Sequence, residues 1–391
     1  MIDAFSFIRP PRIRFGAQKL SELPGIVTAF GKKAVLVTGA SSLKKSGVLQ
    51  AIGSQFKNAS IEHTHVFISG EPSTEQIDEL TAACRAFKPD VVVAIGGGSV
   101  IDAGKAIAAM LRHEGGAADY LEDIGGRRPS GEKAAFIAVP TTAGTGSEAT
   151  TNAVLRGPGK NGAKKSLRHV NFMPDAAVVD PRLMVGCPPQ VTAACGMDAF
   201  TQLLESYVSV KASAVTDALA LSGIDQVRDN LLFAASTGSS DVGVRSGMAY
   251  GALMSGITLA NAGLGVVHGM AGVIGGRFQI PHGVVCGSLV GPATRATMEK
   301  LRRIDPMHPA LCKYAVVGWR LVNTSIGSVE NGCENLLNII TSWSKDLHIP
   351  SLGKYGITPA DFEAIANESG NRNNPVQLDK EDMKAVLREA V

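Results

Sequence analysis

Short apolar runs that alternate with stretches of helical spacing dominate the first half of this chain. Uninterrupted apolar runs of four or five residues are typical of strands covered on both faces. The clearest runs are 34–38, 91–95, 136–139 and 176–179, and weaker strands are expected at 12–16 and 63–68. Since strands that alternate with helices form crossovers, the pattern predicts a mostly parallel α/β sheet.

After residue 180 the strand pattern stops and long helical patterns take over. These patterns cover 191–209, 213–235, 241–262, 299–326 and 330–347, with shorter helices expected at 358–368 and 379–389. We therefore predict an α/β domain over residues 1–183 and an all-helical domain over residues 184–391.

Composition narrows the class of protein. Of 391 residues, 19% are charged and 45% are hydrophobic, which suits a compact folded chain rather than a disordered one. The net charge of +3 is small, and the Lys and Arg residues are scattered without interleaved aromatics. We therefore expect no nucleic-acid partner.

Cysteines and apolar segments bear on the compartment. The six cysteines include no CxxC pair, so free thiols in a reducing cytoplasm are expected. Residues 246–276 carry no charge and are long enough to span a bilayer. Because they include Ser255, Thr258, Asn261 and many glycines, we predict a buried core helix and no membrane partner.

A glycine-rich turn follows the apolar run at 91–95. Gly97, Gly98 and Ser99 precede a predicted helix, and Asp102 falls in its first turn. Glycines let a backbone approach an anion, and helix-start amides supply donors with a favourable dipole. The alternative is a plain tight turn, and the GxGxxG fingerprint is not met.

A second polar turn follows the run at 136–139. It carries Thr141, Thr142, Thr145 and Ser147. Parallel sheets bind ligands at the carboxyl ends of their strands. A structural loop with Thr–backbone bonds is the alternative, but two such turns together favour a nucleotide-sized polyphosphate ligand.

One helical stretch in the second half carries a carboxylate in apolar surroundings. Asp198 and Gln202 lie four residues apart and share a helical face beside leucines. A buried carboxylate needs a cation or a set of donors. His268 and His282, in apolar glycine-rich stretches, are the candidate partners. Cys286 flanks these motifs, but no basic group that would activate its thiolate is evident from the sequence.

Five motifs together resemble those of the iron-dependent (group III) alcohol dehydrogenases, on the dehydroquinate-synthase-like fold. They are GGGSVIDAGK at 96–105, PTTAGTGSE at 140–148, GMDA at 196–199, HGMA at 268–271 and PHG at 281–283. The resemblance implies an NAD(P)-binding α/β domain, a helical domain and a catalytic metal in the cleft between them. It also implies hydride transfer between the nicotinamide and a small alcohol, aldehyde or ketone, in at least a homodimer.

The resemblance assigns cofactor roles motif by motif. Gly97, Gly98, Ser99 and Asp102 would hold the pyrophosphate and neighbouring groups, while Thr141, Thr142, Thr145 and Ser147 would line the cofactor site. Lys164, ten residues before Pro174, would reach the ribose; the alternative is a solvated surface lysine.

The residue at the end of the first long strand affects the choice between NAD and NADP as cofactor. Members that prefer NAD often place an acidic residue there, where this chain has Gly39. No carboxylate would repel a 2′-phosphate, and Ser41, Ser42 or Lys44 could contact one. We expect NADP(H) to be at least accepted.

The metal motif departs from the family at one position. Asp198, His268 and His282 match, but Gln202 stands where the family has a third histidine. A neutral amide is a poorer ligand for Fe²⁺ or Zn²⁺, so Mg²⁺ or Mn²⁺ could gain. Gly272 replaces a histidine that many members carry as a candidate proton relay.

Three interpretations of this site follow. Asp198, His268, His282 and either Gln202 or water bind a metal; or the site works without metal, with a histidine or water supplying the proton; or the histidines are core residues only. The leading function is an NAD(P)-dependent alcohol dehydrogenase or carbonyl reductase.

Two other functions compete with an oxidoreductase. One is a sugar-phosphate cyclase, a lyase on the same fold, which needs a basic pocket where the sequence offers only Arg277. The other is a non-catalytic nucleotide- or metal-binding protein, which the loss of one ligand would permit.

Overall fold

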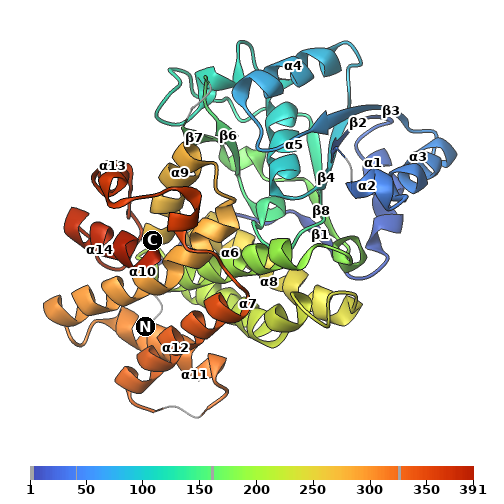
Figure 1. The fold of residues 1–391 in the computed structure, drawn as a ribbon. Helices are drawn as coiled ribbons and strands as arrows, with labels where there is room; N and C mark the ends of the chain where they lie inside the picture. Colours follow the sequence, from blue (N-terminus) through green and yellow to red (C-terminus); the bar gives the residue numbers. More distant parts are fainter. Residues whose placement is uncertain (1–3, 41, 160–162, 325–326) are drawn as a thin grey trace. The chain divides into compact units, whose positions relative to one another are not determined.

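The computed structural model describes residues 4–40, 42–159, 163–324 and 327–391 (Figure 1). They form two compact units, which are taken in turn. The sheet unit comprises 8–142 and 146–185, and the helical unit comprises 4–7, 143–145 and 186–391, within the described ranges. The predicted fold class, an α/β part followed by a helical part, is confirmed. The boundary after residue 183 stays a prediction.

The sheet unit contains a six-stranded sheet in which all neighbouring strands are parallel. Its strand order is β1 (Arg12–Phe15), β8 (Ala176–Val179), β5 (Ala135–Pro140), β4 (Val91–Gly96), β2 (Lys33–Gly39) and β3 (Glu62–Ile68). The sequence missed an antiparallel pair, β6 (Asn152–Arg156) and β7 (Lys164–Arg168). These strands mix polar and apolar residues, so they lack the apolar run that identified the others.

Helices cover both faces of the sheet, which explains the uninterrupted apolar runs. Successive residues of a strand point to opposite faces. On β4, Val92 packs in the cluster that contains α4 (Thr74–Arg85) and α5 (Gly98–Met110). Its neighbour Val93 packs with α1 (Leu23–Thr28), α2 (Ser42–Lys45) and α3 (Val48–Asn58).

The strand order gathers the predicted cofactor turns at one edge. Strands β2, β4 and β5 are adjacent, and their register pairs Thr38 with Ile95 and Gly96 with Pro140. Their carboxyl ends therefore meet at the same edge, where parallel sheets bind ligands.

The helical unit is built around α6 (Pro189–Val208), which is buried along most of its length and packs against α7, α8 and α10. The remaining helices are α7 (Ala214–Ala234), α8 (Val242–Ala262), α9 (Val266–Phe278), α10 (His282–Ile304), α11 (Pro309–Leu321), α12 (Val329–Asp346), α13 (Phe362–Glu368) and α14 (Lys380–Ala390) (Figure 1).

The helix predicted over 241–262 is confirmed as α8, and two other helix predictions were wrong. The uncharged segment 246–276 is not one core helix, because α9 follows α8 after a bend of 102°. Gly263 forms the break: its φ is 69°, and a Cβ there would lie 2.4 Å from Nδ2 of Asn373. The helix expected over 299–326 is the end of α10 followed by α11, because Pro309 begins a new helix behind its cap, His308.

No single helix in the described ranges has both the length and the apolarity to cross a membrane; α8 and α9 pass that test only as a bent pair. No disulfide joins any of the six cysteines, all of which the structure describes.

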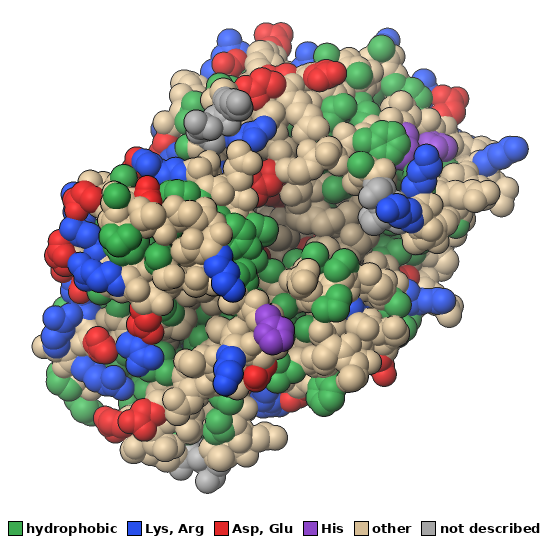
Figure 2. All heavy atoms as spheres, in the orientation of Figure 1, with side chains coloured by type: hydrophobic (Ala, Val, Ile, Leu, Met, Phe, Trp, Pro, Cys, Tyr) green, Lys and Arg blue, Asp and Glu red, His purple; other side chains and the backbone are tan. Residues whose placement is uncertain are grey.

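Charged side chains of both signs intermingle on the face drawn in Figure 2. In the helical unit, Lys313 pairs with Asp217 at 2.8 Å and Lys300 with Asp379 at 2.8 Å. Neighbouring charges of opposite sign weaken each other's field over a surface.

The packing of α5 on the sheet generates a prediction about Gly104. A Cβ at this position would lie 2.5 Å from the Cβ of Ala94 and 2.9 Å from the Phe136 ring. We expect Gly104→Ala to lower the free energy of unfolding by about 1–3 kcal/mol through overpacking. Gly53 on α3 is the matched control, since a Cβ there meets nothing within 4 Å. Urea unfolding curves should show Gly53→Ala unchanged or stabilised by about 0.4–1 kcal/mol; equal curves for the two variants would contradict the prediction.

Candidate functional site

The first turn of α5 and the residues directly after β5 lie at the carboxyl end of the parallel sheet. Gly97 caps α5, and its carbonyl oxygen accepts from the amides of Val100 at 3.0 Å and Ile101 at 3.1 Å. A Cβ on Gly97 would lie 3.4 Å from Thr142 Oγ1, so glycine keeps the space between the two turns open. Helix-start amides beside a glycine and a hydroxyl fit the phosphates of a dinucleotide.

The other predicted cofactor residues are placed as follows. Gly39 ends β2, and Gly98 and Ser99 begin α5. Ser147 begins a short 3₁₀ helix, Ser147–Ala149, in the sheet unit, whereas Thr145 belongs to the helical unit. Ser41 lies outside the described residues.

Asp102 and Lys164 both form polar contacts within the sheet unit. Asp102 Oδ2 accepts from the amide of Val154 at 3.1 Å, which ties α5 to β6. Lys164 Nζ pairs with Glu71 Oε1 at 2.5 Å in an exposed contact, although the lysine side chain as a whole is only 8% exposed. Their roles toward a cofactor stay predictions.

Lys105, a buried lysine to which the sequence assigned no role, supports the second polar turn through hydrogen bonds. Lys105 Nζ donates to the carbonyl of Ser147 at 2.9 Å, to Thr150 Oγ1 at 2.8 Å and to the carbonyl of Asn152 at 2.7 Å. Burial lowers the pKa of Lys105 to about 8 and raises the pKa of nearby Glu148 to about 7. Both residues lie inside the motifs that carry the family resemblance, which was the available signal.

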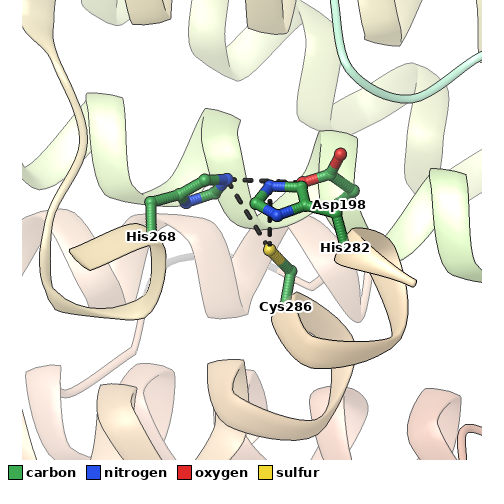
Figure 3. A group of neighbouring side chains, drawn as sticks. All are labelled: Asp198, His268, His282 and Cys286. Carbon is green, nitrogen blue, oxygen red and sulfur yellow. Dashed lines mark hydrogen bonds and ion pairs between the residues drawn. The ribbon is translucent and has the colours of Figure 1, made fainter. Parts of the chain in front are cut away.

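The helical unit brings Asp198, His268 and His282 together, as the sequence predicted, and adds Cys286 (Figure 3). Asp198 Oδ1 lies 3.3 Å from His268 Nε2 and 3.7 Å from His282 Nε2. The Cys286 sulfur lies 3.7 Å from His268 Nε2 and 3.6 Å from His282 Nε2. The four ligand atoms all lie within 4.8 Å of one another.

Local structure explains how these side chains converge. Asp198 projects from buried α6, and His268 is in the first turn of α9. His282 begins α10 and Cys286 follows one turn later, so both leave the same helical face. The expectation that Cys286 has no basic neighbour was wrong: two imidazoles flank its sulfur. The spacing of four from His282 was the sequence signal for it.

Glu205 fixes the orientation of His268 and was missed in the sequence. Its Oε2 accepts from His268 Nδ1 at 2.7 Å, and its Oε1 accepts from the amide of Val267 at 2.7 Å. When His268 is neutral with its proton on Nδ1, Nε2 is the nitrogen left to bind a cation beside Asp198. A carboxylate behind a histidine in this way is the usual support of a metal ligand. Glu205 shares the face of α6 that carries Asp198, a spacing of seven residues.

Gln202, the predicted fourth ligand, is held by another helix. Its Oε1 accepts from Ser255 Oγ of α8 at 2.7 Å, and the Gln202 side chain is buried. One of the two lone pairs of the amide oxygen, the only good metal-binding atom of Gln202, is therefore used in a hydrogen bond.

The cluster shifts the ionisation of its members. Burial raises the pKa of Asp198, but His282, His268 and Cys286 more than offset this, and the pKa is lowered. Burial opposes charged imidazoles, yet the sulfur of Cys286 and the carboxylates outweigh it. The pKa of His268 is well above 6.5 and that of His282 rises to about 8. A site that favours cations in this way, with two imidazoles, a carboxylate and a sulfur, fits a divalent metal.

The contact between Glu205 and His268 generates a prediction. In Glu205→Gln the side-chain oxygen can still accept from Val267, so the NH₂ group faces His268 Nδ1. We expect the pKa of His268 in the metal-free protein to fall, because the carboxylate that holds its Nδ1 proton is lost. Imidazole NMR titration measures this, with surface Glu389→Gln as the control; an unmoved His268 pKa would contradict it.

Two models of known protein families together match most of the chain. Residues 10–181 match the iron-containing alcohol dehydrogenases, and residues 192–391 match the C-terminal part of the Fe-containing alcohol dehydrogenase family. The curated relatives include an NADPH-dependent butanol dehydrogenase of Clostridium saccharobutylicum, 32% identical over 97% of this chain and 96% of the relative. A 1,3-propanediol dehydrogenase of Klebsiella pneumoniae is 33% identical over 92% of each chain.

Solved structures agree with this assignment. An archaeal alcohol dehydrogenase from a Red Sea brine pool superposes with a TM-score of 0.91 at 26% identity, covering 100% of this chain and 99% of the other. A 1,3-propanediol oxidoreductase superposes with a TM-score of 0.89 at 31% identity, covering 100% of both chains. The motifs quoted from the sequence, the fold and the relatives agree: this chain belongs to the iron-containing alcohol dehydrogenase family.

Proposed function

We propose that this chain interconverts a small alcohol and its aldehyde or ketone at a site formed by Asp198, His268 and His282. Family membership makes it an NAD(P)-dependent alcohol dehydrogenase, in a family that binds a divalent metal. The observation that carries the site is the convergence of the carboxylate and two imidazoles, with ligand atoms 3.3 and 3.7 Å apart.

Each residue of the helical unit has a role in this proposal. When bound, a divalent cation supplies Lewis-acid polarisation of a carbonyl oxygen. Asp198 contributes charge to the binding of that cation, and His268 and His282 contribute neutral nitrogens. Glu205 keeps the proton of His268 on Nδ1.

The sheet unit binds and orients the cofactor, which carries the hydride chemistry. We assign the pyrophosphate to Gly97, Gly98 and Ser99 at the start of α5, and the wall of the cofactor site to the threonines that follow β5. Lys105 supports that wall by holding the carbonyl of Ser147.

The lyase alternative is less well supported. A sugar-phosphate cyclase would need cations near the cluster, and Arg277, the nearest candidate in the sequence, pairs with Glu368 at the surface. A metal-independent reductase stays a distinct outcome of the test below.

We also infer a cytoplasmic location and a homodimer or larger homo-oligomer. A buried thiol beside two histidines suits a reducing compartment. Exposed apolar side chains of the helical unit, such as Phe233 at 60% and Met307 at 88% exposure, offer surface for a contact between copies.

Turnover and metal content of Asp198→Asn test the function. The native protein should oxidise NADPH in the presence of short aldehydes or ketones. We expect Asp198→Asn to lose metal, and kcat/KM to fall at least about 100-fold, or 2.7 kcal/mol, because an amide replaces the only carboxylate of the cluster. The exposed Asp229→Asn is the matched control. Turnover that survives in metal-free Asp198→Asn would establish the metal-independent reaction, and no turnover on any carbonyl would overturn the proposal.

Cofactor preference gives a second test. We expect NADPH to be accepted, since β2 ends at Gly39 without a carboxylate, and the name of the Clostridium relative specifies NADPH. A Cβ on Gly39 would meet Val100 at an ordinary 3.8 Å, so Gly39→Asp can be built. In Gly39→Asp, kcat/KM for NADPH should fall about tenfold or more relative to NADH, roughly 1.4 kcal/mol of repulsion. A native enzyme that uses NADPH more than about a hundredfold less well than NADH would refute the expectation.

A further inference from the structure

We propose that Cys286 is a ligand of the catalytic metal, so that the cation is held by Asp198, His268, His282 and a thiolate. This inference rests on the metal role in the proposed function. It replaces the expectation from the sequence that Gln202 or water completes the ligand shell.

Four of the six distances between the ligand atoms match the edges of a tetrahedral site, and no pair of these atoms is more than 4.8 Å apart. For zinc bonds of about 2.0–2.1 Å to nitrogen or oxygen and about 2.3 Å to sulfur, a tetrahedron has edges of about 3.4 Å between N or O ligands and about 3.6 Å between S and N. The carboxylate-to-imidazole distances are 3.3 and 3.7 Å, and the sulfur-to-imidazole distances are 3.7 and 3.6 Å. Cys286 therefore occupies a corner of a site already spaced for a metal.

Gln202 is the weaker candidate for this corner. Its amide oxygen accepts from Ser255 at 2.7 Å, and as a ligand it would bring no charge. A thiolate, like the carboxylate of Asp198, brings a negative charge that attracts a divalent cation in a buried site.

A purely structural role for Cys286 explains less. Its side chain is fully buried and packs in the cluster of α9, α10 and α14, as an inert cysteine would. A cysteine with only a packing role does not need imidazole nitrogens beside its sulfur. The Cys286 sulfur lies 3.6 and 3.7 Å from the Nε2 atoms of two histidines. Those are the atoms that Glu205 and the helix starts direct into the site.

A thiolate ligand reverses the expected choice of metal. Thiolate and imidazole ligands favour zinc and other late first-row metals, whereas amide and carboxylate oxygens suit Mg²⁺ and Mn²⁺. Zinc also expands to five-coordination, so four protein ligands remain compatible with a catalytic site. We therefore expect Zn²⁺ and Co²⁺ to bind far more tightly than Mn²⁺.

Cobalt loading of the metal-stripped full-length protein tests the proposal, because a Co²⁺–thiolate bond gives a sulfur-to-cobalt charge-transfer band in the near ultraviolet. We expect one Co²⁺ per chain and this band in the native protein. Cys286→Ser should lose the band. Its affinity for Zn²⁺ should fall about 100-fold or more, and this fall should be larger than the fall in its affinity for Mn²⁺. Cys195→Ser is the matched control: Cys195 is a thiol three residues before Asp198 but outside the four-residue cluster, so the band should persist.

A second variant guards against misfolding of Cys286→Ser. Adding Gln202→His to Cys286→Ser supplies a third imidazole, and we expect cobalt binding to recover without the charge-transfer band. Recovered binding with the band present would overturn the proposal.

The outcomes separate this inference from the proposed function. Cobalt bound to the native protein without the band, or a band that survives Cys286→Ser, overturns the role of Cys286 and leaves the oxidoreductase proposal standing. A band that depends on Cys286 in a protein with no carbonyl turnover supports the ligand and overturns the function. If the native protein binds no metal, the proposal that Cys286 is a metal ligand is overturned. Carbonyl turnover by that metal-free protein would still support the oxidoreductase function.

Discussion

The buried carboxylate of Asp198 is the constraint around which the helical unit is arranged. Its side chain is almost fully buried on α6, and a charge in that position is unstable without partners. The start of α9 and the start of α10 deliver an imidazole each, at 3.3 and 3.7 Å. Glu205, on the same face of α6, then orients His268 from behind. One helical face thus supplies both the charge and the support for its partner.

In the sheet unit, the main constraint is where a largely apolar sheet can offer polar groups. Its four inner strands, β2, β4, β5 and β8, are buried on both faces, so they offer polar groups mainly where they end. The adjacency of β2, β4 and β5 places three such ends side by side. Glycine at position 97 keeps the gap to Thr142 open, and Lys105 supports the neighbouring turn from inside. Of the two turns proposed to bind the cofactor, the second is therefore supported from inside by Lys105, and Gly97 places no side chain between them.

Gln202 and Cys286 are best understood together. Gln202 stands where the family pattern has a histidine, and it bonds Ser255. Cys286 brings a softer atom to the same group of ligands from the next turn after His282. Cys286 on α10 thus offers a fourth candidate ligand in place of the histidine that is absent at position 202, and it changes the chemistry of the set.

The sequence alone determined the parallel sheet, the helical second half and the end of the helix predicted over 241–262, because apolar periodicity is a local signal. The family motifs marked Asp198, His268 and His282 as partners. The sequence missed the separate helix α9, the helix break at Pro309 and the polar strands β6 and β7. Only the tertiary structure decided that Glu205 supports His268, that Ser255 holds Gln202 and that the sulfur of Cys286 joins the cluster. These contacts join separate helices, and their direction depends on how the helices pack, which no spacing within one segment specifies.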